Sequence, residues 1–197
     1  MTTVIVALEG ELSREYFENN RPSSHYNIVY SGVGKVNASI VATQIQDDTI
    51  INYGTAGIVS NKPLIGKLVE PDVLIQRDML AMPQAPRGVT PFEDSYVAHT
   101  ISLGVGTNIT LGTGDSFVSE PDPWFDYASI DLVDMEGYAI AKSAYIHHKK
   151  FYCVKYVSDF ADEDAAETWE QNQADGRQQF MEWLRQFDKQ QMEKTNE

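Results

Sequence analysis

Basic residues are scarce in this chain, whose 197 residues include 15 Lys and Arg against 29 Asp and Glu, a formal net charge of −14 at pH 7. Proteins that bind nucleic acids or anionic membranes contact the phosphates with clustered Lys and Arg. The charge therefore argues against nucleic acid and membrane partners. A small neutral or zwitterionic ligand is compatible with it.

Cysteine is almost absent from the sequence. Cys153 is the only one and lies in the apolar run FYCVKYVSD, so an intramolecular disulfide is excluded and the thiol is expected to be a small buried group. The N-terminal MTTVIVALEGE lacks a basic segment followed by a signal-like apolar core, and no apolar run approaches the ~18 residues of a membrane span. We therefore expect a soluble cytoplasmic protein.

Motifs for metals and cofactors are also missing. The spacing typical of metal ligands is not found among the four histidines, which are His25, His99, His147 and His148. The stretch SGVGK, residues 31–35, matches neither the phosphate-binding pattern GxxxxGK followed by Ser or Thr nor a full GxGxxG. We expect neither a metal nor an organic cofactor.

Apolar, β-branched runs alternate with helical patterns in the first third of the chain. TVIVAL and NIVYSG predict short buried strands, and Val36, Ile40 and Val41 in VNASIVATQIQDD are spaced like one face of a helix. TIINYGTAG, residues 49–57, predicts a strand that runs into a Gly-rich turn. Because strand, helix, strand is typical of a parallel sheet, the pattern predicts an α/β fold.

The later segments continue this alternation. SIDLVDMEGYAIAKSAYIHHKK predicts a strand and a helix, and FYCVKYVSD predicts a further buried strand. The C-terminal segment predicts a helix with a core-facing side made of Phe180, Trp183, Leu184 and Phe187. No repeat or linker divides the chain, which favours a single domain over residues 1–197. The Pro-rich loop at Met79–Glu93 is long enough to be a functional lid or a partner contact.

Polar and Gly-rich stretches follow several of the predicted strands, where α/β proteins bind ligands. They are ALEGE, SGVGK, NYGTAG, TGDSFVSE, VDMEG and YVSDFAD. Each is a weak signal alone. Asp134 and Glu136 in VDMEG, for example, also suit the start of a helix, where the helix dipole favours negative charge.

The order of these stretches resembles that of the methylthioadenosine/S-adenosylhomocysteine nucleosidases of the purine nucleoside phosphorylase superfamily, from the first strand to about Asp162. VDMEGYAIA together with VSDFAD is the specific part of the match. The resemblance implies a three-layer αβα sandwich with a central mixed, mainly parallel sheet. It also implies hydrolysis of a purine nucleoside, with methylthioadenosine or S-adenosylhomocysteine as substrate, by a homodimer.

The resemblance gives three carboxylates a role in breaking the N-glycosidic bond, a reaction that needs an acid at the base, an activated water and groups that hold the ribose. Asp159 matches the acid that protonates purine N7, oriented by Ser158. Glu11 matches the base that activates the water, and Glu9 is the competing carboxylate. Glu136 matches the acceptor for the ribose hydroxyls.

Further residues of the implied site contact the substrate. Phe117 resembles the aromatic residue that stacks on the purine, with the alternative of a plain core phenylalanine, and the Val118 backbone would read the base edge. Met135 would pack against the sugar. Thr55 and Gly57 would lie near the ribose and the water. Asp134 is expected to serve the helix start rather than the chemistry.

The sequence also departs from the family's pattern. Lys150 replaces a proline, and the segment Leu12–Tyr30 is short, which puts an expected hairpin in doubt. The segment around Met79–Glu93 does not follow the better-known lids, which leaves open the 5′ substituent and any part played by a second subunit. Arg77 and Asp78 form a local ion pair or touch the substrate.

Two alternatives compete with the hydrolase. A phosphorylase of the same fold needs an anion cradle. No arginine is immediately beside NYGTAG or ALEGE in the sequence, where the arginines are Arg14, Arg21, Arg77, Arg87, Arg177 and Arg185. A non-catalytic nucleoside-binding protein would lack one of the three carboxylates, whereas Glu11, Glu136 and Asp159 are all present. The hydrolase is therefore favoured.

Overall fold

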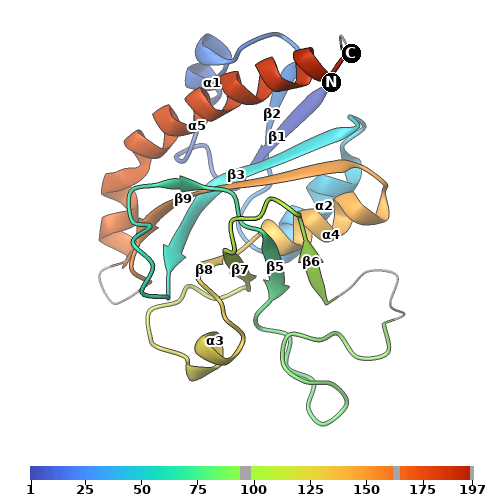
Figure 1. Ribbon diagram of the computed structural model, residues 1–197, viewed down its shortest axis with the longest axis vertical. Coiled ribbons are helices and arrows are strands. Elements are labelled where there is room, and N and C mark those ends of the chain that lie inside the picture. The colour runs from blue at the N-terminus through green and yellow to red at the C-terminus, as the bar shows by residue number, and fades with distance from the viewer. Residues whose placement is uncertain (94–98, 162–164, 196–197) are drawn as a thin grey trace.

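The computed structural model describes residues 1–93, 99–161 and 165–195, and its elements are shown in Figure 1. The strands are β1 Thr2–Val6, β2 Tyr26–Tyr30, β3 Thr49–Ile58, β4 Leu68–Val69, β5 Val73–Gln76, β6 Thr100–Ser102, β7 Thr110–Thr113, β8 Leu132–Asp134 and β9 Lys150–Asp159. The helices are α1 Arg14–Asn20, α2 Lys35–Gln44, α3 Pro123–Tyr127, α4 Gly137–Ile146 and α5 Ala165–Thr195.

All nine of these strands belong to one sheet, with the order β2-β1-β3-β8-β7-β5-β6 and with β9 paired to β3 and β4. The pairs β1–β2, β1–β3, β3–β9, β5–β7 and β7–β8 are parallel. The pairs β3–β8, β4–β9 and β5–β6 are antiparallel. The mixed, mainly parallel sheet is confirmed, while the single domain over residues 1–197 stays a prediction.

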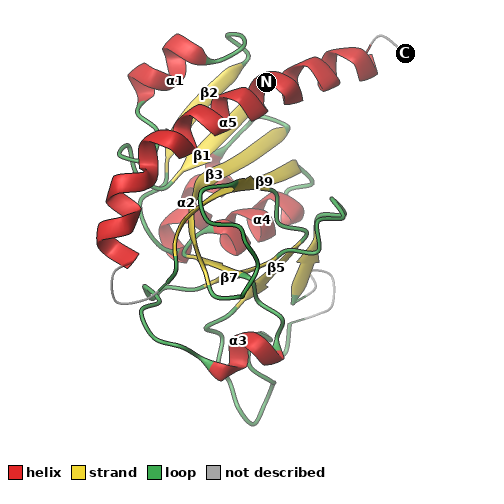
Figure 2. Cartoon of the chain, turned by 60° about the vertical axis from the view of Figure 1, so that its left-hand side comes forward, coloured by secondary structure: helices red, strands yellow, loops and turns green. Residues whose placement is uncertain are grey.

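Helices cover both faces of the sheet, with α1 and α5 on one side and α2 and α4 on the other (Figures 1 and 2). Alternate side chains of a strand point to opposite faces, and β1 shows this directly. Val4 and Val6 belong to the cluster that includes the α5 aromatics, whereas Ile5 belongs to the cluster formed with α2 and α4. The predicted three-layer αβα sandwich is confirmed.

The long helix α5 covers its face of the sheet with the aromatic side predicted from the sequence. Phe180 and Leu184 are fully buried, Phe187 is 7% exposed, and Trp183 packs against the same cluster. The Phe180 ring stacks on Tyr53 of β3 with their centroids 4.1 Å apart. Among the described residues, no helix is both long and apolar enough to cross a membrane.

The helix predicted around Val36 exists as α2, but the predicted buried face is wrong. Val36 and Ile40 are 68% and 52% exposed, while Ala38 and Ala42 are fully buried. These two alanines lie in one cluster with residues of α4. Small side chains let two helix backbones approach closely, so α2 turns its alanines inward and leaves its larger apolar residues outside.

The Gly-rich end of β3 was predicted to be a turn, but the strand continues through it to Ile58. The register against β9 shifts between Ala56 and Gly57. A Cβ atom on Gly57 would lie 2.6 Å from Asp159 Oδ1 and 2.9 Å from Ala161 Cβ. Glycine at this position therefore allows the close approach of β3 and β9 rather than a reversal of the chain.

Two departures from the family's pattern, the short segment before β2 and Lys150 in place of a proline, can be followed in the structure. Residues 12–30 are fully described and contain α1 and then β2, with no hairpin between them. Lys150 begins β9, and its backbone N–H donates to Asp48 O at 2.8 Å. A proline could not make this hydrogen bond because it lacks the N–H group.

Substitution of Phe180 by alanine is expected to lower the free energy of unfolding by about 3–5 kcal/mol, because it leaves a cavity against Tyr53. Urea unfolding followed by circular dichroism measures the change. The control Met192→Ala removes a side chain that is 54% exposed and should change stability by less than about 0.5 kcal/mol. Equal effects of the two substitutions would contradict the packing described for α5.

Candidate active site

A cavity of about 310 Å³ opens beside the ends of β1, β3, β8 and β9. Its size is suitable for a small organic ligand. Eight of the residues singled out in the sequence line it, namely Glu11, Thr55, Gly57, Phe117, Val118, Met135, Glu136 and Asp159. Ser158 does not line the cavity but contacts Asp159 from behind. Sequence reasoning did not place Asp134, Leu8 and Val33 in the wall, and it considered substrate contact by Arg77 as one of two alternatives.

Glu11 follows β1 and is 5% exposed. Its Oε1 atom accepts hydrogen bonds from the backbone N–H and the hydroxyl of Thr55, both at 2.9 Å, and its Oε2 atom accepts one from Leu8 N at 3.2 Å. Glu9, the competing carboxylate, is exposed and is not among the cavity residues. The geometry therefore favours Glu11 as the carboxylate that faces a ligand.

Glu136 lies in the opposite wall of the cavity, immediately before α4. It is 8% exposed. Its Oε1 atom accepts a hydrogen bond from Gly34 N at 2.8 Å, so the SGVGK stretch contributes a backbone donor to the cavity. Gly34 has φ 94°, a left-handed conformation that favours glycine. Burial and then the charge of Asp134 raise the pKa of Glu136 to about 7, while Lys155 and Gly34 act in the opposite direction.

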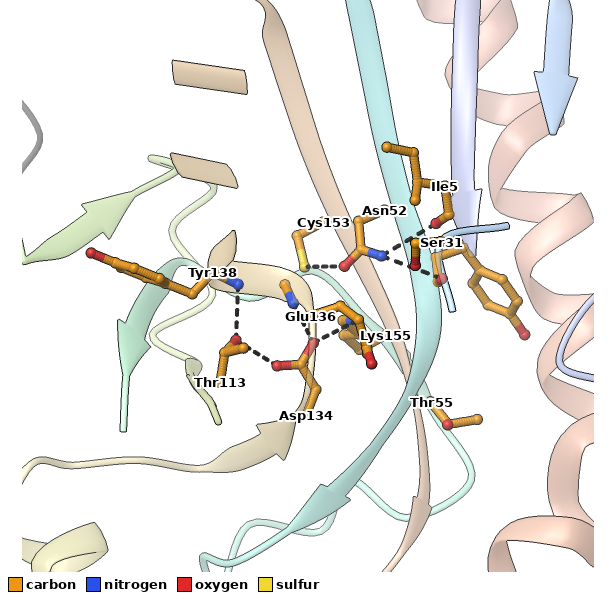
Figure 3. A network of polar contacts seen from close by, with 12 residues as sticks. Ile5, Ser31, Asn52, Thr55, Thr113, Asp134, Glu136, Tyr138, Cys153 and Lys155 are labelled. Carbon is orange, nitrogen blue, oxygen red and sulfur yellow. Dashed lines mark hydrogen bonds and ion pairs between the residues drawn. The ribbon is translucent and has the colours of Figure 1, made fainter. Parts of the chain in front are cut away.

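Lys155 is a buried cation that the sequence analysis missed, because it lies inside an apolar strand. Its side chain is 1% exposed and its Nζ atom lies 2.8 Å from Asp134 Oδ2 (Figure 3). Asp134 also accepts hydrogen bonds from Thr113 Oγ1 at 2.5 Å and from Gly137 N at 2.7 Å. The contact with Gly137 confirms the expected role of Asp134 at the helix start, and the contact with Lys155 adds an ion pair.

The Lys155 ammonium group lies near Glu11, and it interacts electrostatically with Glu136. Gly54 lies between Lys155 and Glu11. A Cβ atom on Gly54 would lie 3.5 Å from Lys155 Nζ and 3.3 Å from Glu11 Oε1. Burial lowers the pKa of Lys155, but the charges of Asp134 and Glu136 outweigh it and hold this pKa above its usual range.

In the described part of the chain, no cluster of three or more His, Cys, Asp or Glu side chains is arranged to hold a metal ion.

Asp159 ends β9 at the other side of the cavity and is 5% exposed. Ser158 Oγ lies 2.6 Å from its Oδ2 atom, and Ala161 N donates to its Oδ1 atom at 2.9 Å. A serine hydroxyl can donate to a carboxylate or accept from a carboxylic acid, so this contact suits both protonation states. Asp162, the last residue of VSDFAD, lies outside the described residues.

Residues 114–118, which follow β7 and which we call the base loop, carry Phe117 and Val118. Phe117 is 55% exposed and lines the cavity, so the alternative of a plain core phenylalanine is wrong. The loop is tied to neighbouring elements by Asp115, which accepts a hydrogen bond from Lys35 N at 2.7 Å. An exposed aromatic ring at the cavity wall is available to stack on a flat ligand.

The loop Met79–Glu93 contributes no residue to the cavity in the part of the chain that is described. Arg87 fastens it elsewhere, through an ion pair with Asp122 at 2.7 Å and a contact with the Trp124 ring at 4.4 Å. Its most exposed apolar residues are Leu80, Met82 and Phe92, at 69%, 66% and 93%. The loop is therefore not a lid over this cavity, and a partner contact stays a prediction.

Arg77 and Asp78 do not pair with each other among the ion pairs of the described residues. Asp78 instead pairs with Lys35 at 2.6 Å and accepts a hydrogen bond from Asp115 N at 2.8 Å. Arg77 lines the cavity and donates to the base loop. The local ion pair considered in the sequence analysis is therefore wrong.

A family model described as the phosphorylase superfamily matches residues 13–189. The chain belongs to this superfamily. A curated 5′-methylthioadenosine/S-adenosylhomocysteine nucleosidase from Staphylococcus saprophyticus is 28% identical over 166 residues, which cover 73% of this chain and 72% of the relative. The family resemblance seen in the sequence is therefore confirmed, at the distance that such an identity indicates.

Solved structures share the fold of this chain. The S-adenosylhomocysteine nucleosidase of Streptococcus pyogenes in complex with 5-methylthiotubericidin has a TM-score of 0.73 at 26% identity and covers 94% of this chain and 96% of its own. The futalosine hydrolase of Helicobacter pylori has a TM-score of 0.79 at 19% identity and covers 93% of this chain and 94% of its own. The fold is thus shared by proteins named for different substrates.

The Glu136 carboxyl is expected to titrate near pH 7, because burial and Asp134 oppose its ionisation. ¹³C NMR of protein labelled at glutamate Cδ measures this, and the resonance is identified by its loss in Glu136→Gln. The exposed Glu18, replaced in Glu18→Gln, identifies a control resonance. Since the folded-state pKa is raised, ionisation lowers stability as pH rises from about 4.5 to about 7. A midpoint for Glu136 below about 5 would contradict the described environment.

Proposed function

We propose that this protein hydrolyses the N-glycosidic bond of a purine nucleoside, with 5′-methylthioadenosine and S-adenosylhomocysteine as its substrates. The observation that carries the proposal is the convergence of Glu11, Glu136 and Asp159 on one cavity beside the exposed ring of Phe117. These groups match the needs of the reaction: an acid at the base, a base for water and an acceptor for the ribose. The nucleosidase relatives support the same assignment.

Departure of the base begins at Asp159. Its carboxylic acid donates a proton to purine N7, and the bond between ribose C1′ and N9 breaks with its electron pair going to the base. The ribose then carries the positive charge of an oxocarbenium ion. The Glu136 carboxylate accepts hydrogen bonds from the 2′ and 3′ hydroxyls and opposes that charge, while Met135 packs against the sugar.

Attack by water completes the reaction on the other face of the sugar. Glu11 takes a proton from the water, whose oxygen forms the new bond to C1′. The two hydrogen bonds from Thr55 fix the Glu11 carboxylate for this task. The products are the free base and the ribose moiety, and transfer of the proton from Glu11 to Asp159 through solvent restores both groups. The step uses neither a metal nor an organic cofactor.

The walls and surroundings of the cavity support the choice of substrate and assembly. Leu8 and Val33 line it with apolar side chains that are 38% and 42% exposed, which suits a thioether at the ribose 5′ position.

Exposed apolar residues on α2, α4 and the loop Met79–Glu93 support a homodimer, as expected from the resemblance. They include Val36, Ile40, Tyr145, Ile146, Leu80, Met82 and Phe92. A cytoplasmic location stays a prediction.

A phosphorylase remains the second candidate because two cations lie in or near the cavity, Arg77 in its wall and Lys155 behind it. Lys155 lies near Glu11, but its charge is paired with Asp134. Arg77 directs its hydrogen bonds to the base loop. Lys155 is thus already paired, Arg77 already holds the base loop, and the Glu11 carboxylate would repel a phosphate. Hydrolysis is therefore the favoured reaction.

Free adenine should be released from 5′-methylthioadenosine and S-adenosylhomocysteine, faster than base is released from adenosine, inosine or futalosine. Chromatography of the products measures this, with and without phosphate. Release without phosphate is expected, because the attacking group is water. Release only with phosphate would establish a phosphorylase, and preference for futalosine would correct the 5′ substituent. No release from any of these nucleosides would overturn the proposal.

Asp159→Asn should lower kcat by at least about 10²-fold while the fold is kept, because the amide cannot donate the proton to N7.

Glu11→Gln should lower kcat by a similar factor and retain binding of a substrate analogue, measured by calorimetry. Glu9→Gln is the matched control, since Glu9 is exposed in the same stretch. If Glu9→Gln lost activity and Glu11→Gln kept it, the assignment of the water-activating carboxylate would be reversed.

A further inference from the structure

Arg77 is a buried arginine that the proposed reaction does not use. It follows β5, is 3% exposed and lines the cavity. Its guanidinium group donates to Ser116 Oγ at 3.0 Å, to Gly114 O at 3.2 Å and to Ser116 O. All of these acceptors belong to the base loop, and all are uncharged. The Nε atom is buried, and the described residues offer it no acceptor.

The positive charge of Arg77 has no carboxylate in direct contact among the described ion pairs. Burial lowers the pKa of Arg77, and the more distant Asp78 and Asp134 act against this. An arginine remains protonated in proteins even so. No carboxylate neutralises this charge by a direct ion pair, and Asp78 and Asp134 act on it from farther away, in surroundings where water screens it poorly.

The base loop fits tightly against the end of β5. A Cβ on Gly114 would lie 2.9 Å from both Arg77 Cζ and Asp78 Cγ. Asp78 accepts a hydrogen bond from Asp115 N at 2.8 Å. The consecutive residues Arg77 and Asp78 thus hold the loop at two points, immediately before Phe117.

Arg77 is also the point where the divergent loop reaches the cavity. Arg87 Nε donates to Arg77 O at 2.8 Å, and the same side chain pairs with Asp122. No described residue of Met79–Glu93 lines the cavity itself. The divergent segment is therefore connected to the base end of the cavity, through Arg77, rather than to the 5′ end.

We propose that Arg77 is a positioning residue for the base: it fixes the base loop and places a positive charge beside the departing purine. The proposal rests on the proposed function, because it concerns the base that leaves. As the C1′–N9 bond breaks, the electron pair moves onto the base, and a cation in the cavity wall stabilises this charge. The effect adds to protonation by Asp159 and is greatest for bases that are poor leaving groups.

Two variants separate the two parts of this role. Arg77→Met removes both the charge and the hydrogen bonds to the base loop. Arg77→Lys keeps the charge but cannot bond three acceptors at once. The control is Arg21→Met, because Arg21 also donates to a backbone carbonyl, that of Tyr26, and does not line the cavity. Circular dichroism and thermal unfolding establish that each variant is folded.

The kinetic test uses 5′-methylthio nucleosides of adenine, hypoxanthine and 6-chloropurine, whose bases differ in acidity. Arg77→Met should lower kcat about 10²-fold for the base that is the poorest leaving group, and much less for the most acidic base. Arg77→Lys should keep the wild-type dependence on base acidity and raise KM, because the loop is less well held. An equal loss with every base, or no loss, would overturn the electrostatic role.

Binding of the free bases tests the same proposal without turnover. Calorimetry at a pH where 6-chloropurine is anionic should show at least about tenfold weaker binding to Arg77→Met than to the wild-type protein, and a smaller change for neutral adenine. If the wild-type protein hydrolyses nucleosides and Arg77→Met binds both bases as the wild type does, the role of Arg77 is refuted and the proposed function stands. A wild-type protein that binds the bases in this way without hydrolysis would refute the proposed function alone. Absence of any base binding would overturn the inference.

Discussion

The ion pair between Lys155 and Asp134 is the interaction on which the cavity depends. Both side chains are 1% exposed, so each would be costly to bury without the other. The pair joins β9 to β8, and Asp134 extends the connection to β7 through Thr113 and to the start of α4 through Gly137. The ammonium group also lies near Glu11, and its positive charge acts on Glu136, which is a further buried carboxylate. Three acids can be gathered in a small space because this cation lies among them.

The rest of the cavity is built by backbone groups that hold side chains at fixed positions. Glu11 accepts the Thr55 N–H, Glu136 accepts the Gly34 N–H, and Asp159 accepts the Ala161 N–H. These donors come from β3, from the turn before α2 and from the chain after β9. Because the sheet fixes the relative positions of these segments, the carboxylates are oriented before any ligand arrives. Such preorganisation is the main way in which a rigid fold supports catalysis.

The base end of the cavity is organised differently. There the base loop is held by the side chains of Arg77, Asp78 and Lys35 rather than by a network of carboxylates. The chain belongs to the phosphorylase superfamily, and its fold is shared by solved structures named for different substrates. The segment that departs from the nucleosidase pattern, Met79–Glu93, is attached to this end through Arg87.

The sequence by itself determined the α/β alternation, the apolar side of α5 and the stretches that meet at the strand ends, because these depend on local periodicity and on the order of short motifs. It did not determine which face of α2 is buried, since Ala38 and Ala42 matter only once α4 lies against them. It did not reveal that NYGTAG continues β3, because the closeness of Gly57 to Asp159 depends on strand pairing. Lys155 was hidden for the same reason, and for Arg77 the sequence left a local ion pair and substrate contact both open. A lone cation in an apolar strand or after one gains its partners from distant parts of the chain, and only the tertiary structure brings them together.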